Sequence, residues 1–494
     1  MVSSWLSIAQ INTLVYPKNN ITISDRNPVF KWNMLSNVPE NVISISQDSL
    51  FIQDVIQNSS TTNNYQYTSD LESGKWFWKV EFYSEMDTIV SPAAFFHVFE
   101  PTDLSNIIVW YKPGDDDLGT SNILNDRTQN NFHALQANID KRPEVVDANI
   151  NPNYKFISFD GENDRLSVNF QSQMSHPLTS FCMWDKETQN IGYAFDGYQN
   201  GKRNALFTTT DKINYYAGGS VRNYNSDLNG IRLNTIYFSN SSSKIFENGL
   251  LKNQSSVGSN NLSGLSIGSR YNSIHHLTGG IGELIFYNYQ LSEIDTKIVE
   301  KYLMDRIQPP INLGEDLTPE YDPSSCLSLQ IGSQVQYKNY LWSSGDSTQF
   351  INIESAGTYI LEVVDLFDRI SIDTILIYDP VDSALSLNKF LCFNQDLVIE
   401  IEPDSMFNFL EWSDGDSSLT KVISDEGYLS YSIIDQNSCT VYSPLFYIPI
   451  DSSLQDISLG LDTSLCSGNL IQLIQDTSAT VSYTHLTLPT TGSV

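Results

Sequence analysis

The sequence predicts an all-β protein built from several β-sandwiches. Its 494 residues are enough for several domains, each with its own core. Apolar and polar residues alternate over short stretches, as at Tyr359, Leu361 and Val363, and turn residues separate these stretches. Aromatic residues make up 12% of the chain, with Tyr and Phe more frequent than Trp. This composition favours many short strands over long helices.

Residues 8–101 are predicted to form the first sandwich. "NPVFKWN" places Trp32 on an early strand, and "AAFFHVFEP" gives a last strand that ends at Pro101. Between them, "SGKWFWKVEFY" alternates four large apolar residues on one face: Trp76, Trp78, Val80 and Phe82. An early Trp followed by an aromatic-rich later strand resembles the fibronectin type III domain. The aromatic residues are expected to form the core.

Residues 105–310 contain an ordered series of motifs. These are "FISFDGENDRLSV", "KIFENGLLKNQSS", "LSIGSRYNS" and "GGIGELIFYNYQLSEIDTKIVEKYL". In this order they resemble the laminin-G-like/concanavalin A-like jelly roll, which implies two packed antiparallel sheets. The residues point the same way, because Asn248-Gly249 between apolar residues predicts a β-hairpin.

Two acidic stretches repeat each other. "YLWSSGDSTQFINIESAGTYILEVVD" (340–365) returns as "FLEWSDGDSSLTKVISDEGYLSYSIID" (409–435). The copies predict two immunoglobulin-like sandwiches, at 322–380 and 384–450, and a truncated third copy at 451–481. The last segment, 482–494, resembles a translated library adapter and is treated as a non-native tail.

The repeat also relates the cysteines to one another. Arg369 in the first copy and Cys439 in the second each lie 27 residues after the Trp of their copy, Trp342 and Trp412. Cys392 and Cys439 fall within one copy, which predicts a disulfide between them in an oxidising compartment. Connectivity cannot be read from sequence, so the alternative that these cysteines are small buried hydrophobes stays open.

The stretch "LSEIDTKIVE" contains Glu293 and Asp295, which resemble part of the Glu-x-Asp-x-x-Glu signature of laminarinase-type glycosidases. In that family the acids share one face of a strand. Here Ser292 and Asp295 form a capping-box pattern, and apolar residues from Ile294 to Leu303 recur at helical spacing. A helix would point the two acids in different directions. We therefore predict a helix and no catalysis at this motif.

A calcium site is the first binding hypothesis. Asp160, Asn163 and Asp164 group oxygen ligands at a turn, and Glu283 is a candidate further ligand. The alternative is a turn in which the Asp160 side chain caps the backbone. Ca²⁺ is the one cofactor that the sequence suggests.

A carbohydrate site is the second binding hypothesis. Sugars offer apolar faces ringed by hydroxyl groups, which aromatic rings and planar donors recognise. "GYQNGKRN" and "GSRYNS" supply Tyr198, Arg203, Arg270 and Tyr271 in predicted loops. The predicted partner is a polysaccharide, or a glycan or protein of a cell surface.

The net charge of the chain excludes some classes of binding partner. The net charge is −31, and residues 311–480 hold 26 acidic but four basic residues. This balance argues against nucleic acids and anionic membranes as partners. No apolar run is long enough to span a membrane, and the start has no basic region typical of a signal peptide. We expect the chain to be a fragment of a longer extracellular or cell-surface protein.

The modules together suggest adhesion or carbohydrate binding by a bacterial surface or secreted protein, with no catalysis in this region. The alternative is an accessory binding region of a larger secreted glycosidase or peptidase. A third reading makes the jelly roll a spacer without a ligand. The sequence does not predict the oligomeric state.

Overall fold

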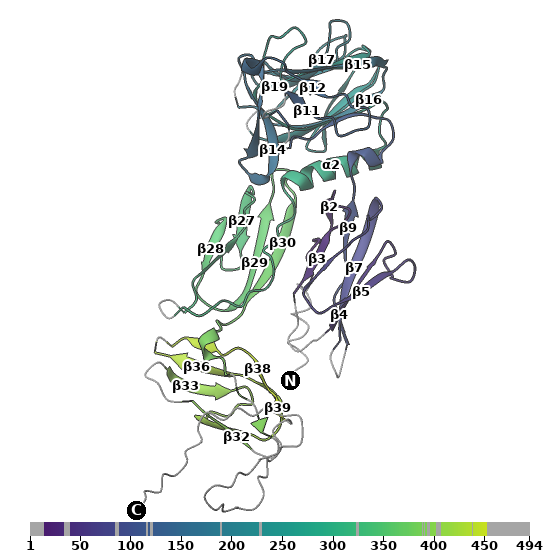
Figure 1. The fold of residues 1–494 in the computed structure, drawn as a ribbon. Helices are drawn as coiled ribbons and strands as arrows, with labels where there is room; N and C mark the ends of the chain where they lie inside the picture. The colour runs from purple at the N-terminus through teal and green to yellow at the C-terminus, as the bar shows by residue number, and fades with distance from the viewer. Residues whose placement is uncertain are drawn as a thin grey trace, which may run out of the picture. The chain divides into compact units, whose positions relative to one another are not determined.

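The structure is a computed structural model that places most of the chain (Figure 1). It describes residues 14–33, 40–83, 88–114, 117–118, 122–187, 190–226, 230–322, 326–387, 389, 391–392, 396–401, 407–436 and 438–451. The predicted third repeat and the tail lie outside the described residues, apart from Asp451. The chain divides into two compact units: 1–316 with 330–351 and 358–376, and 317–329 with 352–357 and 377–494.

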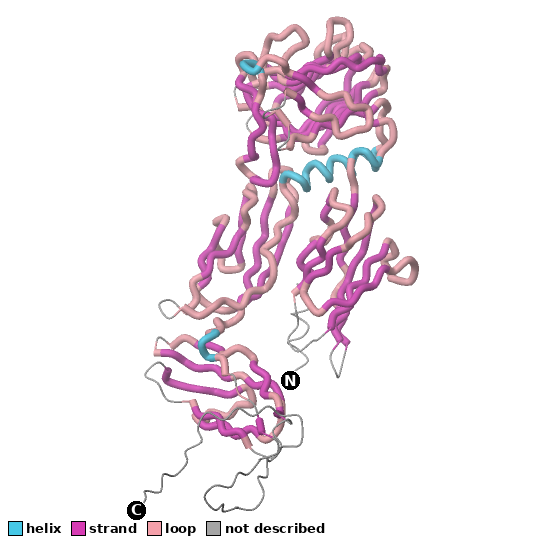
Figure 2. The backbone as a smooth tube through the Cα atoms, viewed as in Figure 1, coloured by secondary structure: helices cyan, strands magenta, loops and turns pink. Residues whose placement is uncertain are grey.

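The described chain is all-β, as predicted, with one long helix among many strands (Figure 2). Near the N-terminus of the first unit, two sheets enclose a core. One sheet has the order β1 (Leu14–Tyr16), β3 (Val29–Trp32), β6 (Asn64–Gln66). The other has the order β2 (Ile21–Ile23), β9 (Ala94–Val98), β7 (Gly74–Tyr83), β4 (Glu40–Ser46), β5 (Ile56–Ser60), with β8 (Thr88–Val90) beside β7. The predicted alternation on β7 is confirmed, because Trp76, Trp78, Val80 and Phe82 are all buried.

The central part of the first unit is a sandwich of two eight-stranded sheets. We call them sheet 1 and sheet 2. Sheet 1 has the order β13 (Glu144–Ala148), β14 (Asn151–Asp160), β25 (Thr278–Tyr287), β16 (Leu178–Trp184), β21 (Arg232–Phe238), β22 (Ser243–Glu247), β23 (Leu250–Ser255), and β10 (Ile107–Tyr111) pairs with β25. Sheet 2 has the order β11 (Ile123–Leu124), β12 (Ala134–Leu135), β15 (Leu166–Met174), β24 (Leu262–Ile267), β17 (Gly192–Gly197), β18 (Ala205–Thr209), β19 (Lys212–Tyr216), β20 (Arg222–Asn225).

Strand alternation divides the residues of this sandwich between its core and its outer faces. On β25, Leu284 and Phe286 join the core between the sheets, whereas Ile285 and Tyr287 face the other way. The predicted hairpin is confirmed, because β22 and β23 pair around Asn248 and Gly249 at φ 53° and 78°. Positive φ at both central residues is what a primed turn requires.

The helix α2 (Glu293–Ile307) covers the outer face of sheet 1, where it packs on Phe181, Ile285 and Tyr287. The predicted cap is confirmed, since the Ser292 side chain accepts a hydrogen bond from the Asp295 N–H. Val299, Tyr302 and Leu303 are buried as expected. Ile294 was expected on the same apolar side but is 81% exposed, because it lies on the side of the helix opposite to the buried Thr296 and Leu303.

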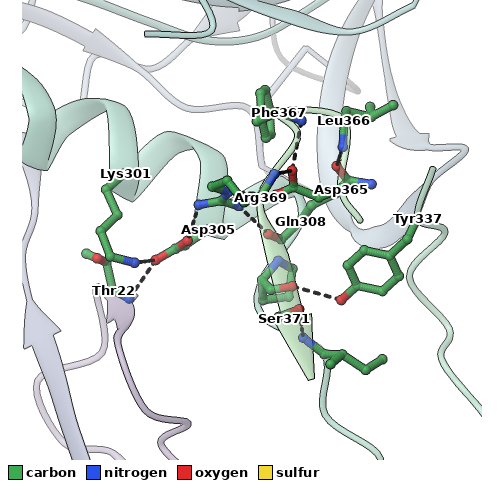
Figure 3. Close-up of polar contacts among 12 residues, drawn as sticks. Thr22, Lys301, Asp305, Gln308, Tyr337, Asp365, Leu366, Phe367, Arg369 and Ser371 are labelled. Carbon is green, nitrogen blue, oxygen red and sulfur yellow. Dashed lines mark hydrogen bonds and ion pairs between the residues drawn. The ribbon is translucent and has the colours of Figure 1, made fainter. Parts of the chain in front are cut away.

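Near its end, α2 carries a junction of charged groups (Figure 3). The buried Asp305 carboxylate accepts a hydrogen bond from the Thr22 N–H at 2.8 Å and pairs with Lys301 and Arg369. Arg369 also pairs with Asp365 and donates to the Gln308 carbonyl. Within the first unit, one carboxylate thus links β2, α2 and the turn before β30 (Ile370–Ile377).

The two acidic copies share one local structure. In the first, Trp342 N–H bonds the Asp346 carbonyl and its indole bonds the Thr348 carbonyl at 2.9 Å. In the second, Trp412 N–H bonds the Asp416 carbonyl and its indole bonds the Ser418 carbonyl at 2.8 Å. The repeat read from the sequence is therefore a repeat of hydrogen bonds around a buried Trp.

The strands of the first copy are β26 (Leu329–Gly332), β28 (Phe350–Ile353), β27 (Asn339–Trp342), β29 (Gly357–Val364) and β30. β26 pairs with β28, and the others form the sheet β27-β29-β30. The strands of the second copy are β31 (Leu391–Cys392), β32 (Leu397–Glu400), β33 (Phe407–Trp412), β34 (Thr420–Ile423), β35 (Gly427–Leu429), β36 (Tyr431–Asp435), β37 (Thr440–Tyr442), β38 (Phe446–Ile448) and β39 (Ile450–Asp451). Their sheets are β31-β39, β32-β34, β33-β36-β37 and β35-β38.

The predicted Cys392–Cys439 disulfide is wrong. Cys439 instead bonds Cys326, with their Cα atoms 5.7 Å apart, a normal separation for a disulfide. Both residues lie in the second unit, where the segment around Cys326 packs against the core that includes Cys439. The prediction assumed that Cys439 would pair within its own copy. The segment around Cys326, which precedes the first copy's Trp, instead packs against the core of the second copy and supplies the partner. Cys182 is buried and unpaired, as expected for a core residue.

No helix among the described residues is both long and apolar enough to cross a membrane.

Candidate functional site

The acids of "LSEIDTKIVE" do not form a catalytic pair. Both lie in the first turn of α2 rather than on one face of a strand. Glu293 is exposed and pairs with Lys297 at 2.9 Å, while Asp295 accepts a hydrogen bond from Ser292 at 2.7 Å. They serve as a surface ion pair and a helix cap.

Three of the four predicted calcium ligands lie together at a turn after β14. Asp160 Oδ1 accepts hydrogen bonds from the N–H groups of Glu162, Asn163 and Asp164. Burial raises the pKa of Asp160, but these backbone bonds outweigh it, so its pKa is below the usual value. This is the capping turn that the alternative interpretation described. Asn163 Oδ1 is buried and has no hydrogen-bond partner among the described residues.

Glu283, the fourth predicted ligand, does not join them. It lies five residues beyond Thr278, the cross-strand neighbour of Asp160, which is about 16 Å along β25. Its carboxylate is buried beneath α2, where it accepts from Trp110 Nε1 at 2.8 Å and pairs with Arg306 at 3.0 Å. Glu283 therefore belongs to the packing of α2 on sheet 1. No group of three or more His, Cys, Asp or Glu suited to a metal occurs among the described residues.

Three of the four predicted carbohydrate residues, Arg203, Arg270 and Tyr271, lie together on the outer face of sheet 2. Alternation sends Phe195, Leu206 and Tyr215 into the core. Phe207 and Tyr216, next to Leu206 and Tyr215, therefore point outwards. A break in the regular pairing of β17 between Tyr193 and Phe195 lets Tyr193 pack with them. With the residues described next, they form what we call the tyrosine–arginine face: Tyr193, Asp196, Arg203, Phe207, Tyr216, Arg270, Tyr271 and His275.

Arg203 is fixed at the centre of this face. Its Nε lies 3.0 and 2.9 Å from the two carboxylate oxygens of Asp196, and a terminal nitrogen lies 2.9 Å from Oδ2. Its guanidinium carbon lies 4.9 Å from the ring centroid of Tyr216 and 5.0 Å from that of Tyr271. Arg203 is thus held between two rings by a carboxylate that is fully buried.

A loop that folds back on β17 places Arg203 beside Asp196. A side chain at Gly197 would meet the Lys202 carbonyl oxygen at 2.0 Å and the Arg203 Cα at 2.7 Å. Glycine is therefore required for this close approach. Tyr198 begins the loop, and its N–H bonds the Gly264 carbonyl of the adjacent strand. The predicted Tyr198 thus lies at the border of the face, where the loop leaves β17.

A second loop, 268–277, supplies Arg270, Tyr271 and His275. The Tyr271 N–H donates to Asp196 Oδ2 at 3.1 Å, which joins this loop to the Arg203 pair. The His275 ring stacks on Tyr193 at 6.2 Å, and Tyr193 stacks on Phe207 at 4.5 Å. The result is a column of three flat rings beside the sandwiched arginine.

The neighbouring residue His276 faces the other side of the loop. Its Nδ1 lies 2.9 Å from the Asp164 carbonyl oxygen, next to the Asp160 turn. The two adjacent histidines therefore serve different sides of one loop, as expected from their positions in the sequence. The predicted calcium turn and the tyrosine–arginine face border this loop from opposite sides.

Burial and charge act together on the ionisable groups of the face. Burial raises the pKa of Asp196, although Arg203 opposes the shift. Burial alone would lower the pKa of Arg203, but the bonds to Asp196 outweigh it and the pKa rises. Burial and the nearby Arg270 charge lower the pKa of His275, so its ring is neutral at pH 7. The face therefore carries fixed positive charge on its arginines.

A cavity of about 890 Å³ lies beside α2, within the first unit. Each of the four cations that line it is in an ion pair: Lys18 with Asp373, Lys297 with Glu293, and Lys301 and Arg369 with Asp305. Its charges are thus satisfied within the protein.

Sequence reasoning found Arg203, Arg270 and Tyr271 but missed their partners. Asp196 and Tyr193 stand in the same stretch as Tyr198, but regular alternation would place them on opposite faces, so the irregularity of β17 concealed their common position. Tyr216 and His275 join the face only through strand order and loop conformation, which the sequence does not show.

A scan against protein-family models finds no match, and a search of curated proteins finds no similar sequence. Some solved structures are similar at low TM-scores. The binding domain of botulinum neurotoxin serotype D is 15% identical, with a TM-score of 0.33 over 54% of this chain and 72% of that chain. Domain 4 of the arabinanase AbnA from Geobacillus stearothermophilus, solved with arabinotriose, is 13% identical, with a TM-score of 0.31 over 41% of this chain and 98% of that chain. At these TM-scores neither match bears on ligand or activity.

Proposed function

We propose that this chain is a glycan-binding region of an extracellular or cell-surface bacterial protein, that the tyrosine–arginine face is its binding surface, and that it catalyses no reaction. The observation that carries the proposal is the Arg203 sandwich. Aromatic rings and a rigid planar donor lie side by side on the outside of a sheet, which suits a sugar with an apolar face and ring hydroxyls.

The side chains of this surface are already ordered in the protein without a ligand. Asp196 fixes Arg203, and the Tyr271 N–H fixes the loop. Preorganised groups lose little side-chain entropy on binding. Tyr216 and Tyr271 remain half-buried, so part of each ring is open to a ligand.

The surroundings fit an external location. The Cys326–Cys439 bond suits an oxidising compartment. The repeated acidic copies suit a solvated stalk that presents the central sandwich. An accessory region of a secreted hydrolase would use the same face in the same way.

The test is a glycan array probed with the unaltered chain and with two variants. Tyr271→Ala should lower binding about tenfold, since it removes one ring of the sandwich. Tyr428→Ala, which removes an exposed tyrosine of the second unit, should leave binding unchanged. Failure of the unaltered chain to bind any glycan would instead support the spacer reading.

A calcium arm belongs to the same experiment. Calcium at the Asp160 turn is proposed here because Asn163 offers an unpartnered buried oxygen beside two carboxylates. Removal of Ca²⁺ with EDTA and the variant Asp160→Asn should then weaken binding together. Binding that is equal with and without EDTA would remove calcium from the account.

A further inference from the structure

Arg270 differs from most arginines of the first unit in its ion pairing. The sequence has 58 acidic and 27 basic residues, so most basic side chains are expected to form an ion pair with a carboxylate. Most described arginines of the first unit do so: Arg26, Arg127, Arg203, Arg232, Arg306 and Arg369. Arg270 forms no ion pair among the described residues. Its Nε is buried there without a hydrogen-bond partner.

Asp196, the carboxylate of the tyrosine–arginine face, is not available to Arg270. Asp196 accepts from Arg203 and from the Tyr271 N–H, and it is fully buried. Arg270 lies on the other side of Tyr271, with its guanidinium carbon 5.4 Å from that ring centroid. The face thus has two arginines but one carboxylate, and that carboxylate pairs with Arg203, so the positive charge of Arg270 is not balanced within the face.

A second arginine adds to this charge from the other end of the loop. Arg165 donates a hydrogen bond to Ser273 Oγ, three residues after Arg270. It also forms no ion pair among the described residues, and its Nε is buried without a partner. Arg165 and Arg270, which form no ion pair with any described residue, thus both lie at the 268–277 loop.

We propose that the tyrosine–arginine face selects saccharides that carry a carboxylate, and that Arg270 binds this group. The inference rests on the proposed function and names its ligand class. A guanidinium presents paired N–H donors that match the two oxygens of a carboxylate. Arg203 cannot serve, because Asp196 occupies its donor edge, so it holds the rings in place while Arg270 meets the ligand.

The positive charge at Arg270 has to attract an acidic ligand against the negative charge of the rest of the protein. A net charge of −31 repels acidic polymers at long range. Binding of such a polymer therefore requires a specific contact with a cation, and a protein without this contact would bind neutral saccharides more tightly than acidic ones. A higher affinity for the acidic saccharide than for its neutral counterpart would therefore support the role of Arg270.

The experiment compares ligands that differ only in charge. Polygalacturonate is paired with its methyl ester, and sialyllactose with lactose, so uronate and sialate sources are separated. Dextran sulfate tests whether any polyanion suffices. Binding is measured by calorimetry with the unaltered chain, Arg270→Gln and Arg222→Gln. Arg222 is the matched control, because its cross-strand partner Tyr215 points into the core, away from the face.

We expect at least one acidic ligand to bind about tenfold more tightly than its neutral partner. Arg270→Gln should abolish that ratio, whereas Arg222→Gln should preserve it. Equal binding of acid and neutral forms, or a ratio that survives Arg270→Gln, would overturn the inference while the proposed function stood. Equal binding of dextran sulfate would also overturn it, and no binding at all would overturn both.

Discussion

The two outer faces of the central sandwich use similar residues in opposite ways. On sheet 1, α2 covers the face, and three acids beneath or on it pair with cations: Glu283 with Arg306, Glu293 with Lys297, and Asp305 with Lys301 and Arg369. On sheet 2, Arg270 of the tyrosine–arginine face forms no ion pair with any described residue. Charge pairing, rather than residue type, therefore distinguishes the two faces.

The largest effect is expected at the α2 junction. Asp305→Asn removes the buried negative charge that Lys301 and Arg369 share, and leaves Arg369 with Asp365 alone, so it should lower the free energy of unfolding by about 3–5 kcal/mol. Urea unfolding measures this. Asp368→Asn is the control, because its pair with Lys338 is exposed and should contribute less than about 1 kcal/mol. Equal effects of the two variants would break the distinction between the two kinds of charge.

The repeats extend the comparison to the second unit. The same turn position holds Arg369 in one copy and Cys439 in the other, and each forms a long-range link. Cys326→Ser should lower the stability of the second unit by about 2–5 kcal/mol, since the bond closes a loop of 113 residues. Peptide mapping of the oxidised chain should recover Cys326 linked to Cys439. Recovery of Cys392 linked to Cys439 would contradict the structure.

A smaller effect sharpens the account of the tyrosine–arginine face. Arg270 is one of the groups that lower the pKa of His275, after burial. Arg270→Gln should therefore raise the pKa of His275, because a nearby positive charge no longer disfavours the imidazolium. An NMR titration of the His275 ring measures the shift. An unchanged pKa would mean that Arg270 does not face this side of the loop.

The smallest effect is expected at Glu293. Its side chain is 83% exposed and pairs with Lys297. Glu293→Gln should leave both the unfolding temperature and glycan binding nearly unchanged, because a fully exposed ion pair contributes little to stability. Thermal unfolding and the glycan array test both. Any hydrolysis of a glycan that this variant abolished would revive the catalytic interpretation.

Local patterns predicted local structure well. The capping residues of α2, the Asn248-Gly249 hairpin and the Trp turns each depend on neighbours in sequence, and each is confirmed. The cluster around Arg203 depends on strands that are adjacent only in the sheet order, so Asp196 and Tyr216 were missed. Glu283 was assigned to a metal because sequence does not show that Trp110 and Arg306 surround it.

Hydrogen exchange tests most directly whether the ligand lies on sheet 2. With a saturating glycan from the array, protection should increase in β17, β18 and β19 and in the 268–277 loop, while α2 should exchange as in the free chain. Protection confined to α2 and the residues that line the cavity beside it would contradict the account, since it would place the ligand where every lining cation is already paired.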